Sequence, residues 1–570
     1  MRQRPARRRN PTGSGEDHRL APLLASAGVI TNTRADPVAK SSPSGDLAVR
    51  RPWPGQVASL LSYHWLAAVL VVAGAALRVI TWMAYHPAIF YIDSAKYLYQ
   101  GWQDSDPLGY KIALKLVLSF GDLGAVTALQ HLLGLGMGIA LYALLVRRGV
   151  SRWLSALAMA PILLDAYQLQ AEATIMPDVL FEGMIVAGIC LLLWRPTANW
   201  PTIVGTGLIL GLSATVRELG LWLIGPAVLY LLGSRFLRLS RDDWSGAVVK
   251  SCVLVAVFLV PVLAYCSVSD VVHGYFGLSI KTSPAGRLAQ SADCATLKVR
   301  PAVKQLCPPA SIQDENPDWV QNWVVSVLRD HHISGAQRKR LISDFDHAVE
   351  RQQPLRVAAA VLRDAARLFE VSRTGTLATT PISRWQFKQY FPQYRNNFMV
   401  CGGMFTTDIP PQACDRPDSA GDIIVGVQRR HYKQDYYFLL SPSYGGKAQV
   451  DQPLAAFLQS YQVDGGFTPG PLFLVFALAG LFGSLLALIF RRGNAIGRNM
   501  ALASLVFFTA ALGLLLVGDL YVFSWRYQLQ ALITLPPAGV LGAAAAWQLL
   551  RRGRNPAAPA QLESKPEAPS

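Results

Sequence analysis

The stretch WLAAVLVVAGAALRVITWM, residues 65–83, is apolar throughout except for Arg78. At about 1.5 Å per residue, a helix of this length crosses the hydrocarbon core of a bilayer. The segment YIDSAKYL, residues 91–98, follows it closely and carries Asp93. A carboxylate held this near to hydrocarbon is costly, so its presence indicates a function. Asp93 is therefore the first candidate site residue.

The composition is that of an integral membrane protein. Of the 570 residues, 52% are hydrophobic and 16% are charged, whereas soluble domains are about 25% charged. The net charge of +17 raises the alternative of nucleic-acid binding. However, the basic residues gather near the N-terminus and beside apolar runs, where the positive-inside rule places them. The sequence has no zinc-finger spacing, RNA-binding aromatic motif or phosphate-binding Gly-rich loop, and we predict no nucleic-acid partner.

Basic clusters alternate with apolar runs and predict the topology. If the N-terminus lies inside the cell, every second loop must also lie inside, and each of these loops carries Lys or Arg. We predict a polytopic α-helical protein of the plasma membrane with about ten transmembrane helices and both termini cytoplasmic. The predicted spans are 62–84, 125–146, 151–168, 178–194, 201–216, 219–233, 246–266, 470–490, 499–518 and 528–550.

This topology divides the chain into membrane modules, an exterior domain and tails. The exterior domain is large enough for its own core, and we predict mixed α/β structure for it. The tails are basic or rich in Pro and Ala, with little apolar content, which predicts disorder. The parts are a cytoplasmic tail (1–58), an N-terminal transmembrane catalytic module (59–266), the extracytoplasmic domain (267–469), the C-terminal transmembrane helices (470–550) and a second cytoplasmic tail (551–570).

The cysteines of the polar segment support its exterior location. Cys294 and Cys307 are 13 positions apart, as are Cys401 and Cys414. Four cysteines allow three pairings, and two local loops are the simplest, so we predict Cys294–Cys307 and Cys401–Cys414. A zinc site is the rival interpretation, but paired CxxC units are missing. Because disulfides persist in oxidising compartments, the cysteines and the basic loops assign this segment to the same side.

Within the exterior domain, apolar residues from Leu355 to Phe369 recur at helical spacing with arginines between them. This pattern suits an amphipathic helix at the membrane surface or a helix packed on the domain core. We favour the core-facing interpretation. The stretch 385–444 is rich in aromatic residues, Gly and Pro, which predicts loops with short strands.

Acidic residues at the exterior ends of helices are the catalytic candidates. Asp93 lies in the first exterior loop, and its alternative role is to cap a short helix. Asp104 and Asp106 more simply shape a turn. Glu172 and Asp178 bracket the next exterior turn, where Asp178 also suits the N-terminal end of a helix. In the functional interpretation, these two carboxylates orient an acceptor or a divalent cation.

Arg217, Arg526 and Tyr527 are the candidates for binding a phosphate. Exterior arginines between helices suit the phosphate of a lipid-linked substrate. The structural alternatives are an interfacial ion pair between Arg217 and Glu218, and an Arg526 side chain that snorkels to the interface beside Tyr527.

The order of these features resembles the GT-C superfamily of membrane glycosyltransferases, which use polyprenyl-phosphate sugars. The branch that it looks like includes protein mannosyltransferases and lipid aminoarabinose transferases. The resemblance covers roughly 60–270 and 470–550, and one departure is Ser94, where that branch often has a second acidic residue. The matching residues are Asp93 in its loop, Gly109-Tyr110, Gln130–Gly134 on the helix that ends in Arg147-Arg148, the acidic second loop, Ala214–Glu218, and Arg526-Tyr527 before Pro536-Pro537.

The resemblance implies a GT-C-like fold and an inverting glycosyltransferase that needs no nucleotide. A hexosyl or pentosyl group would pass from a polyprenyl-phosphate donor to an extracytoplasmic glycan, lipid or protein. Asp93 would act as general base, Arg217 and Arg526 with Tyr527 would bind the phosphate, and Glu172 or Asp178 would orient the acceptor. No organic cofactor is expected. The phosphate would be held with or without a divalent cation (Mg²⁺, Mn²⁺ or Ca²⁺).

Two other classes of function stay open at this stage. A lipid or sugar transporter or flippase would also be polytopic, but it should show internal repeats and polar residues at the bilayer midplane. A non-catalytic membrane scaffold for cell-envelope assembly would use the exterior domain for binding. The charges of this chain collect at outer helix ends, which favours an enzyme over a transporter.

Overall fold

The structure is a computed structural model. It describes residues 59, 61–91, 93–98, 106–239, 243–279, 284–330, 334–389, 423–430, 433–440, 444–445, 448–490 and 495–554. The predicted tail at 1–58, residues 555–570, Asp104 and the predicted pair Cys401–Cys414 lie outside these ranges.

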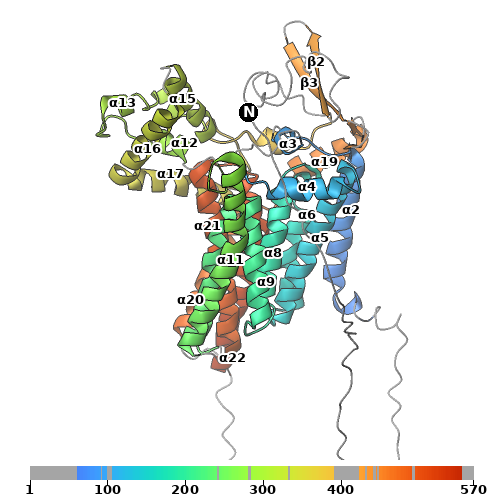
Figure 1. Ribbon diagram of the computed structural model, residues 1–570. Coiled ribbons are helices and arrows are strands. Elements are labelled where there is room, and N and C mark those ends of the chain that lie inside the picture. Colours follow the sequence, from blue (N-terminus) through green and yellow to red (C-terminus); the bar gives the residue numbers. More distant parts are fainter. Residues whose placement is uncertain are drawn as a thin grey trace, which may run out of the picture. The chain divides into compact units, whose positions relative to one another are not determined.

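Long apolar helices dominate the described chain and run side by side (Figure 1). Those before the polar segment are α2 (Trp65–Ala84), α3 (Ser94–Leu98), α4 (Gly109–Leu118), α5 (Leu123–Arg147), α6 (Arg152–Leu164), α7 (Ala166–Ala173), α8 (Asp178–Leu193), α9 (Trp200–Val216), the 3₁₀ turn η1 (Glu218–Leu223), α10 (Ile224–Phe236) and α11 (Trp244–His273). Those after it are α20 (Gly470–Ile489), α21 (Ala495–Tyr521), the 3₁₀ turn η6 (Tyr527–Leu529) and α22 (Gln530–Arg554).

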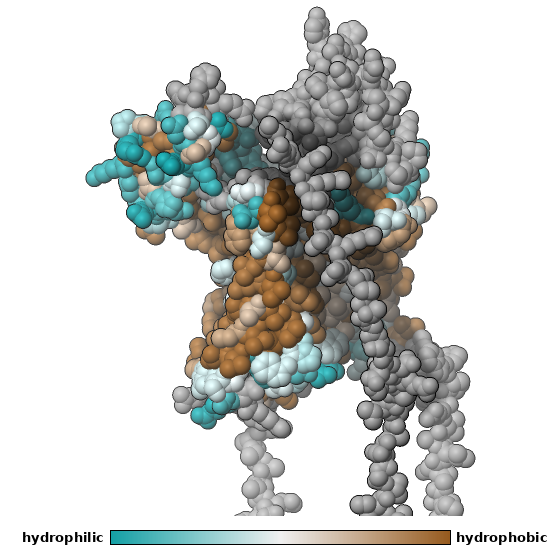
Figure 2. Space-filling view, in the orientation of Figure 1, coloured by the Kyte–Doolittle hydropathy of each residue, from teal (hydrophilic) through white to brown (hydrophobic). Residues whose placement is uncertain are grey.

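The polytopic helical architecture expected from the sequence is confirmed. Among the described residues, 7 helices are long and apolar enough to cross a membrane. The spans predicted at 151–168, 178–194 and 201–216 correspond to α6, α8 and α9, which are shorter. The predicted count of ten helices therefore stays a prediction. On the face seen in Figure 2, hydrophobic side chains cover the long helices, and hydrophilic ones cover α13, α15 and α16.

Polar residues in the loops begin several of these helices. The side chain of Asp122 accepts a hydrogen bond from the Ala125 amide at 3.0 Å, and so begins α5. Asn199 begins α9 in the same way, and Asp243 begins α11. Each cap satisfies an amide that has no partner within its helix.

Small residues let the C-terminal helices approach closely. A Cβ added to Gly483 of α20 would lie 2.4 Å from the Gly542 carbonyl oxygen of α22. The Ser504 hydroxyl of α21 donates to the Ala538 carbonyl at 2.7 Å. Close backbone packing and interhelical hydrogen bonds hold helices together where lipid replaces water.

The polar segment forms helices and a hairpin, in agreement with the mixed α/β prediction. Its elements are α12 (Ala285–Ser291), α13 (Pro301–Lys304), α14 (Ala310–Gln313), α15 (Pro317–Asp330), α16 (Gly335–Gln352), α17 (Pro354–Ala366), the 3₁₀ turns η2 (Arg367–Phe369) and η3 (Ile382–Trp385), β2 (Ile423–Arg430) paired antiparallel with β3 (Lys433–Leu440), β4 (Gln449–Val450) and α19 (Gln452–Val463).

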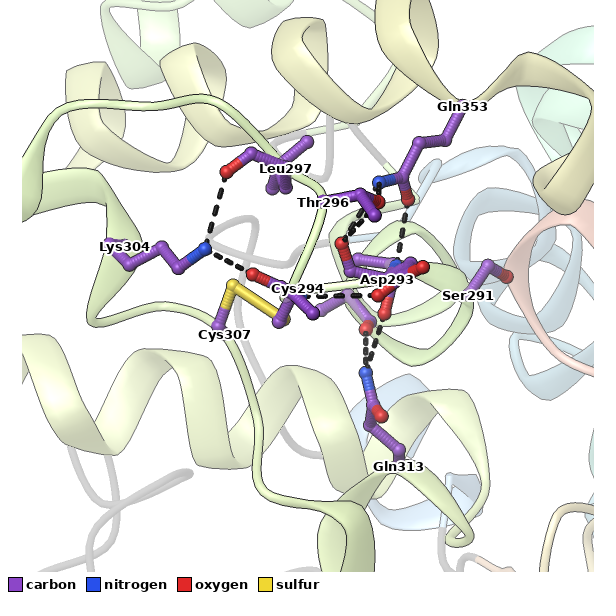
Figure 3. Close-up of a disulfide and its surroundings, with 12 residues drawn as sticks. Ser291, Asp293, Cys294, Thr296, Leu297, Lys304, Cys307, Gln313 and Gln353 are labelled. Atoms are coloured by element: carbon purple, nitrogen blue, oxygen red, sulfur yellow. Dashed lines mark hydrogen bonds between the residues drawn. A yellow bond between two sulfur atoms is a disulfide. The ribbon is translucent and has the colours of Figure 1, made fainter.

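The predicted disulfide Cys294–Cys307 is present, with its Cα atoms 5.8 Å apart (Figure 3). Side-chain amides support the surrounding loop: Gln353 donates to the Asp293 carbonyl at 2.9 Å, and Gln313 donates to the Ala292 carbonyl at 2.8 Å. The loop that the disulfide closes is therefore also held to its neighbouring helices.

Helix α17 only partly follows the preferred core-facing interpretation. Val357 and Val361 are buried, as expected for a helix packed on a core. Leu355 and Leu362, which belong to the same periodic pattern, are 83% and 57% exposed. The apolar pattern therefore serves two faces of the helix.

The end of the polar segment returns to the first span. Strand β1 (Tyr85–His86), directly after α2, pairs antiparallel with β4, so that Tyr85 faces Val450. The Tyr85 hydroxyl donates to the Lys388 carbonyl at 2.8 Å, and the Tyr85 ring stacks on Phe387 at 5.7 Å. These contacts bring η3 beside the loop that carries Asp93.

Candidate functional site

A tight turn holds the loop of Asp93. The Ser94 amide donates to the Tyr91 carbonyl at 2.8 Å, and the Tyr91 amide donates to the Ser94 hydroxyl oxygen at 2.9 Å. The Ser94 hydroxyl in turn donates to the Ile175 carbonyl at 3.0 Å, in the loop before α8. Ser94, which departs from the GT-C pattern, thus ties the Asp93 loop to the loop that leads into Asp178.

Arg526, in the loop between α21 and α22, joins the two aspartates. Its Nη1 lies 3.4 Å from Asp93 Oδ2, and its Nε lies 3.6 Å from Asp178 Oδ1. The Asp93 side chain is 26% exposed, whereas that of Asp178 is fully buried. Of the two carboxylates, Asp93 is therefore the one that a substrate can reach.

Arg217 adds a second guanidinium to the cluster. It follows α9 directly, and its Nη1 forms an ion pair with Asp178 Oδ1. The ring of Tyr527 contacts both arginines, with the guanidinium carbons of Arg217 and Arg526 at 4.8 Å and 4.7 Å from its centroid. The Tyr527 hydroxyl also accepts a hydrogen bond of 2.9 Å from Arg526 Nη2.

The electrostatics keep both arginines charged. Burial disfavours the charge of Arg526, but Tyr527, Asp178 and Asp93 outweigh that cost and hold its pKa well above the ordinary value. Burial also opposes the charge of Arg217, and Asp178 raises its pKa. Two fixed cations therefore face two carboxylates, and Arg526 Nε and Asp178 Oδ2 are buried without hydrogen-bond partners. The cluster therefore holds one donor and one acceptor whose hydrogen-bonding capacity is unused.

Aromatic rings form a wall beside Arg526. Its guanidinium carbon lies 5.8 Å from the Tyr91 ring centroid and 5.1 Å from that of Trp385, and these two rings lie 4.3 Å apart. Burial and the neighbouring Asp93 charge raise the pKa of Tyr91 to about 12, against the opposing charges of Arg526 and Arg384. Tyr91 and Trp385 also line a pocket with Gln170 and Thr174. Cation–π contacts hold the guanidinium in place.

Trp385 is a residue that the sequence did not single out. It lies in the polar segment, far along the chain from every predicted site residue, and its indole is buried. In the sequence, Trp385 is one of many aromatic residues in the stretch 385–444. That pattern does not indicate which of them lies in the site.

Glu172 belongs to a different cluster. Its Oε1 accepts from Arg78 Nη2 at 2.7 Å, and its Oε2 lies 2.9 Å from His131 Nδ1. A Cβ added to Gly134 would lie 1.9 Å from Glu172 Oε1, so only glycine leaves room for the pair. Glu172 is fully buried. Its role in orienting the acceptor stays a prediction. In the structure, its carboxylate forms an ion pair with Arg78, the charged residue within the first span.

The structure brings together Asp93, Asp178, Arg217, Arg526 and Tyr527 from distant parts of the chain. It leaves Glu172 with Arg78, and Asp106 Oδ2 lies 3.5 Å from the Tyr97 hydroxyl. Five of the six predicted site residues thus lie in one cluster, and their roles stay predictions.

The divalent cation that the sequence left as a possibility does not fit the donor set of this cluster. Within the described residues, no group of three or more His, Cys, Asp or Glu could hold a metal ion. Moreover, the Arg526 guanidinium already lies between Asp93 and Asp178, at 3.4 Å and 3.6 Å. A divalent ion needs several oxygen ligands around it, and here the Arg526 guanidinium lies between the two carboxylates.

Distant likenesses exist among solved structures. The chain is similar to the S. cerevisiae protein O-mannosyltransferase Pmt1–Pmt2 complex bound to the sugar donor, with 18% identity, a TM-score of 0.30 and coverage of 41% of this chain and 38% of that one. It is similar to the Archaeoglobus fulgidus oligosaccharyltransferase tethered with an acceptor peptide (12% identity, TM-score 0.38, 87% of this chain and 51% of that chain). It is also similar to ArnT from Cupriavidus metallidurans (13% identity, TM-score 0.29, 84% and 77%).

The chain spans 38% of the mannosyltransferase chain and 51% of the oligosaccharyltransferase chain that it matches. No protein-family model matches the chain, and no curated protein sequence matches it. Because the identities and TM-scores are low, the function proposed below rests on the geometry of the site.

Proposed function

We propose that this protein is a membrane glycosyltransferase of the GT-C type. In this proposal, it transfers a sugar from a polyprenyl-phosphate donor to an acceptor hydroxyl on the exterior side of the membrane. The observation that carries the proposal is the position of Arg526. It pairs with the accessible Asp93 and the buried Asp178, and it shares Tyr527 with Arg217. One cluster thus combines a reachable base with two fixed cations.

The reaction is a single displacement with inversion. Asp93 accepts the proton of the acceptor hydroxyl while that oxygen attacks the anomeric carbon of the donor sugar. A new glycosidic C–O bond forms as the bond between the anomeric carbon and the phosphate oxygen breaks. The electron pair leaves with the polyprenyl phosphate, which is released as the second product. No nucleotide is needed, because the lipid phosphate is already a leaving group.

The arginines have the role of receiving the departing phosphate. Charge grows on the phosphate oxygens as the bond breaks, and preorganised guanidinium groups stabilise it without reorganising. Arg526 can exchange its 3.4 Å contact with Asp93 for the phosphate, and Asp93 then acts as the base toward the acceptor hydroxyl. The buried Asp178 does not reach the substrate in this scheme. It is a positioning residue that holds both arginines.

In this proposal, the sugar packs against the aromatic wall. Tyr91 and Trp385 offer flat apolar surfaces beside Arg526, and sugar rings have apolar faces that pack on such surfaces. Gln170 Oε1 and Trp385 Nε1, in the same lining, are buried without hydrogen-bond partners. A sugar hydroxyl could donate to the first and accept from the second.

The direct test is transfer by the purified protein in lipid nanodiscs. A panel of polyprenyl-phosphate sugars is offered with glycan, lipid and peptide acceptors, and products are identified by mass spectrometry. We expect transfer to an acceptor or slow hydrolysis of one donor, together with release of polyprenyl phosphate. Nucleotide sugars serve as the matched control and should be inactive. If only nucleotide sugars react, the proposed donor class is wrong.

A further inference from the structure

Helix α17 is anchored by one face. Val357, Val361 and Asp364 are buried. Arg287 of α12 forms an ion pair of 2.5 Å with Asp364, and its Nε donates to the Asp519 carbonyl of α21 at 3.1 Å. A single buried guanidinium thus fixes α17 to the last turn of a membrane-spanning helix.

The opposite face of α17 carries an apolar stripe. Leu355 is 83% exposed and Leu362 is 57% exposed. Residues three, four and seven positions apart share one side of a helix, so these two leucines lie on the same side. Ala358, Ala359 and Ala366 complete this exposed stripe. Large apolar side chains so far exposed at regular spacing mark an interaction surface.

Basic residues flank the stripe. Arg356 and Arg363 each follow one of the exposed leucines, are themselves exposed, and are seven positions apart, so they form a row beside it. The Arg356 side chain is 58% exposed, and its Nη1 lies 3.6 Å from the half-buried Asp293. An apolar stripe with arginines at its side is the pattern of a helix that lies in a membrane interface.

The chain after α17 fixes the depth of the helix. Residues 368–370 lie against the start of α20: a Cβ added to Gly470 would be 2.1 Å from the Glu370 carbonyl oxygen. Gly470 is the first residue of a candidate membrane span. The C-terminal end of α17 is therefore held close to the point where α20 begins.

From this placement, we propose that α17 lies on the outer leaflet of the bilayer. Leu355 and Leu362 reach into the boundary between headgroups and acyl chains, and Arg356 and Arg363 contact anionic lipid headgroups. The stripe pattern, its flanking charges and the position of the end of α17 beside the start of α20 together favour lipid over a protein partner. The proposal does not depend on the enzymatic function.

The test is a spin-label scan of the full chain in nanodiscs. Single cysteines replace residues 355–366 in a variant whose other cysteines, except Cys294 and Cys307, are changed to Ala. Collision rates with oxygen and with a water-soluble nickel chelate report immersion. We expect labels at Leu355 and Leu362 to favour oxygen and labels at Arg356 and Arg363 to favour nickel. A label at the exposed Glu350 of α16 is the control and should favour nickel.

Two results would overturn the proposal. Nickel access at Leu355 equal to that at Glu350 would mean that the stripe faces water. Protection of Leu355 and Leu362 from both reagents would mean that a protein covers it. Gel filtration and the thermal midpoint of each labelled variant verify that it is folded.

A second comparison tests the role of the arginines. Nanodiscs of phosphatidylcholine alone are compared with nanodiscs that also contain phosphatidylglycerol. We expect the label at Leu362 to move deeper with the anionic lipid, and this shift to disappear in the double variant Arg356→Gln, Arg363→Gln. Arg340→Gln, at an exposed arginine of α16, is the matched control and should keep the shift. An unchanged shift in the double variant would refute the headgroup contact.

Discussion

Asp178→Asn is the change that most severely perturbs the proposed phosphate site without touching a group that reaches substrate. Asp178 is fully buried and is the shared partner of Arg217 and Arg526. Asparagine keeps the shape and can still accept a hydrogen bond, but it removes the negative charge. Arg217 then loses its ion pair with residue 178, and Arg526 keeps its ion pair with Asp93.

The size of the effect follows from these contacts. Two unit charges about 4 Å apart interact by about 4 kcal/mol at an effective dielectric constant of about 20. Removing one partner of a buried ion pair typically costs about 3–5 kcal/mol, because the remaining charge stays desolvated. We expect Asp178→Asn to destabilise the protein by an amount in that range. We also expect the lost stability to return when an anion replaces the carboxylate.

The assay is thermal unfolding of the purified protein in detergent, with and without polyprenyl phosphate. We expect the variant to unfold at a lower temperature than the wild type and to gain more from the added lipid phosphate. Glu182→Gln is the matched control, because Glu182 is fully buried one turn along α8 and its Oε2 accepts from the neutral Gln168 at 2.9 Å. Equal behaviour of the two variants would refute the charge-balance reasoning.

Three further predictions concern the donor, the disulfide and the topology. Arg526→Lys keeps the charge but loses the planar guanidinium fork. We expect donor affinity, measured by titration, to fall about tenfold to a hundredfold, because a charged hydrogen bond is worth about 1.5–3 kcal/mol. Unchanged affinity would contradict a direct phosphate contact. Replacing Cys294 and Cys307 by Ala should lower stability by about 3 kcal/mol, read from denaturant unfolding of the full chain, and no loss would contradict a stabilising role. With intact cells, an impermeant thiol reagent should label Ser311→Cys but not Ser245→Cys, and the reverse pattern would invert the topology.

Much of the candidate site could be predicted because sidedness is visible in the sequence. Basic loops orient the helices, and that orientation assigns Asp93, Asp178, Arg217 and Arg526 to the same exterior ends. The structure joins these four residues through ion pairs. The sequence could not predict that Asp178 is enclosed while Asp93 is reachable, since burial depends on how the loops pack.

Glu172 shows where the sequence argument stops. Its position in an exterior turn resembles that of Asp178, so the same role was predicted for both. In the structure, Glu172 Oε1 lies 2.7 Å from Nη2 of Arg78, a residue within the first apolar stretch. A charge within a span needs a partner, but spacing along the chain does not reveal which acid supplies it.

The position of Trp385 and the two faces of α17 could be identified only from the tertiary structure, for a different reason. The β1–β4 pairing and the Tyr85–Phe387 stack bring Trp385 to Arg526, and these contacts join segments hundreds of residues apart. The α17 pattern is helical in either interpretation. Only the packing of Val357 against the domain, with Leu355 left exposed, separates the two faces.

The central claim is that Asp93 is the general base, and Asp93→Asn tests it most directly. Transfer from the active polyprenyl-phosphate sugar is measured in a single turnover, and donor affinity is measured separately on the same protein. We predict that transfer falls by about 10²–10⁴, the usual contribution of a general base, while donor affinity is retained because the base acts in the transition state. Asp106→Asn, in the same exterior loop, should keep transfer. Near wild-type transfer by Asp93→Asn would contradict the account.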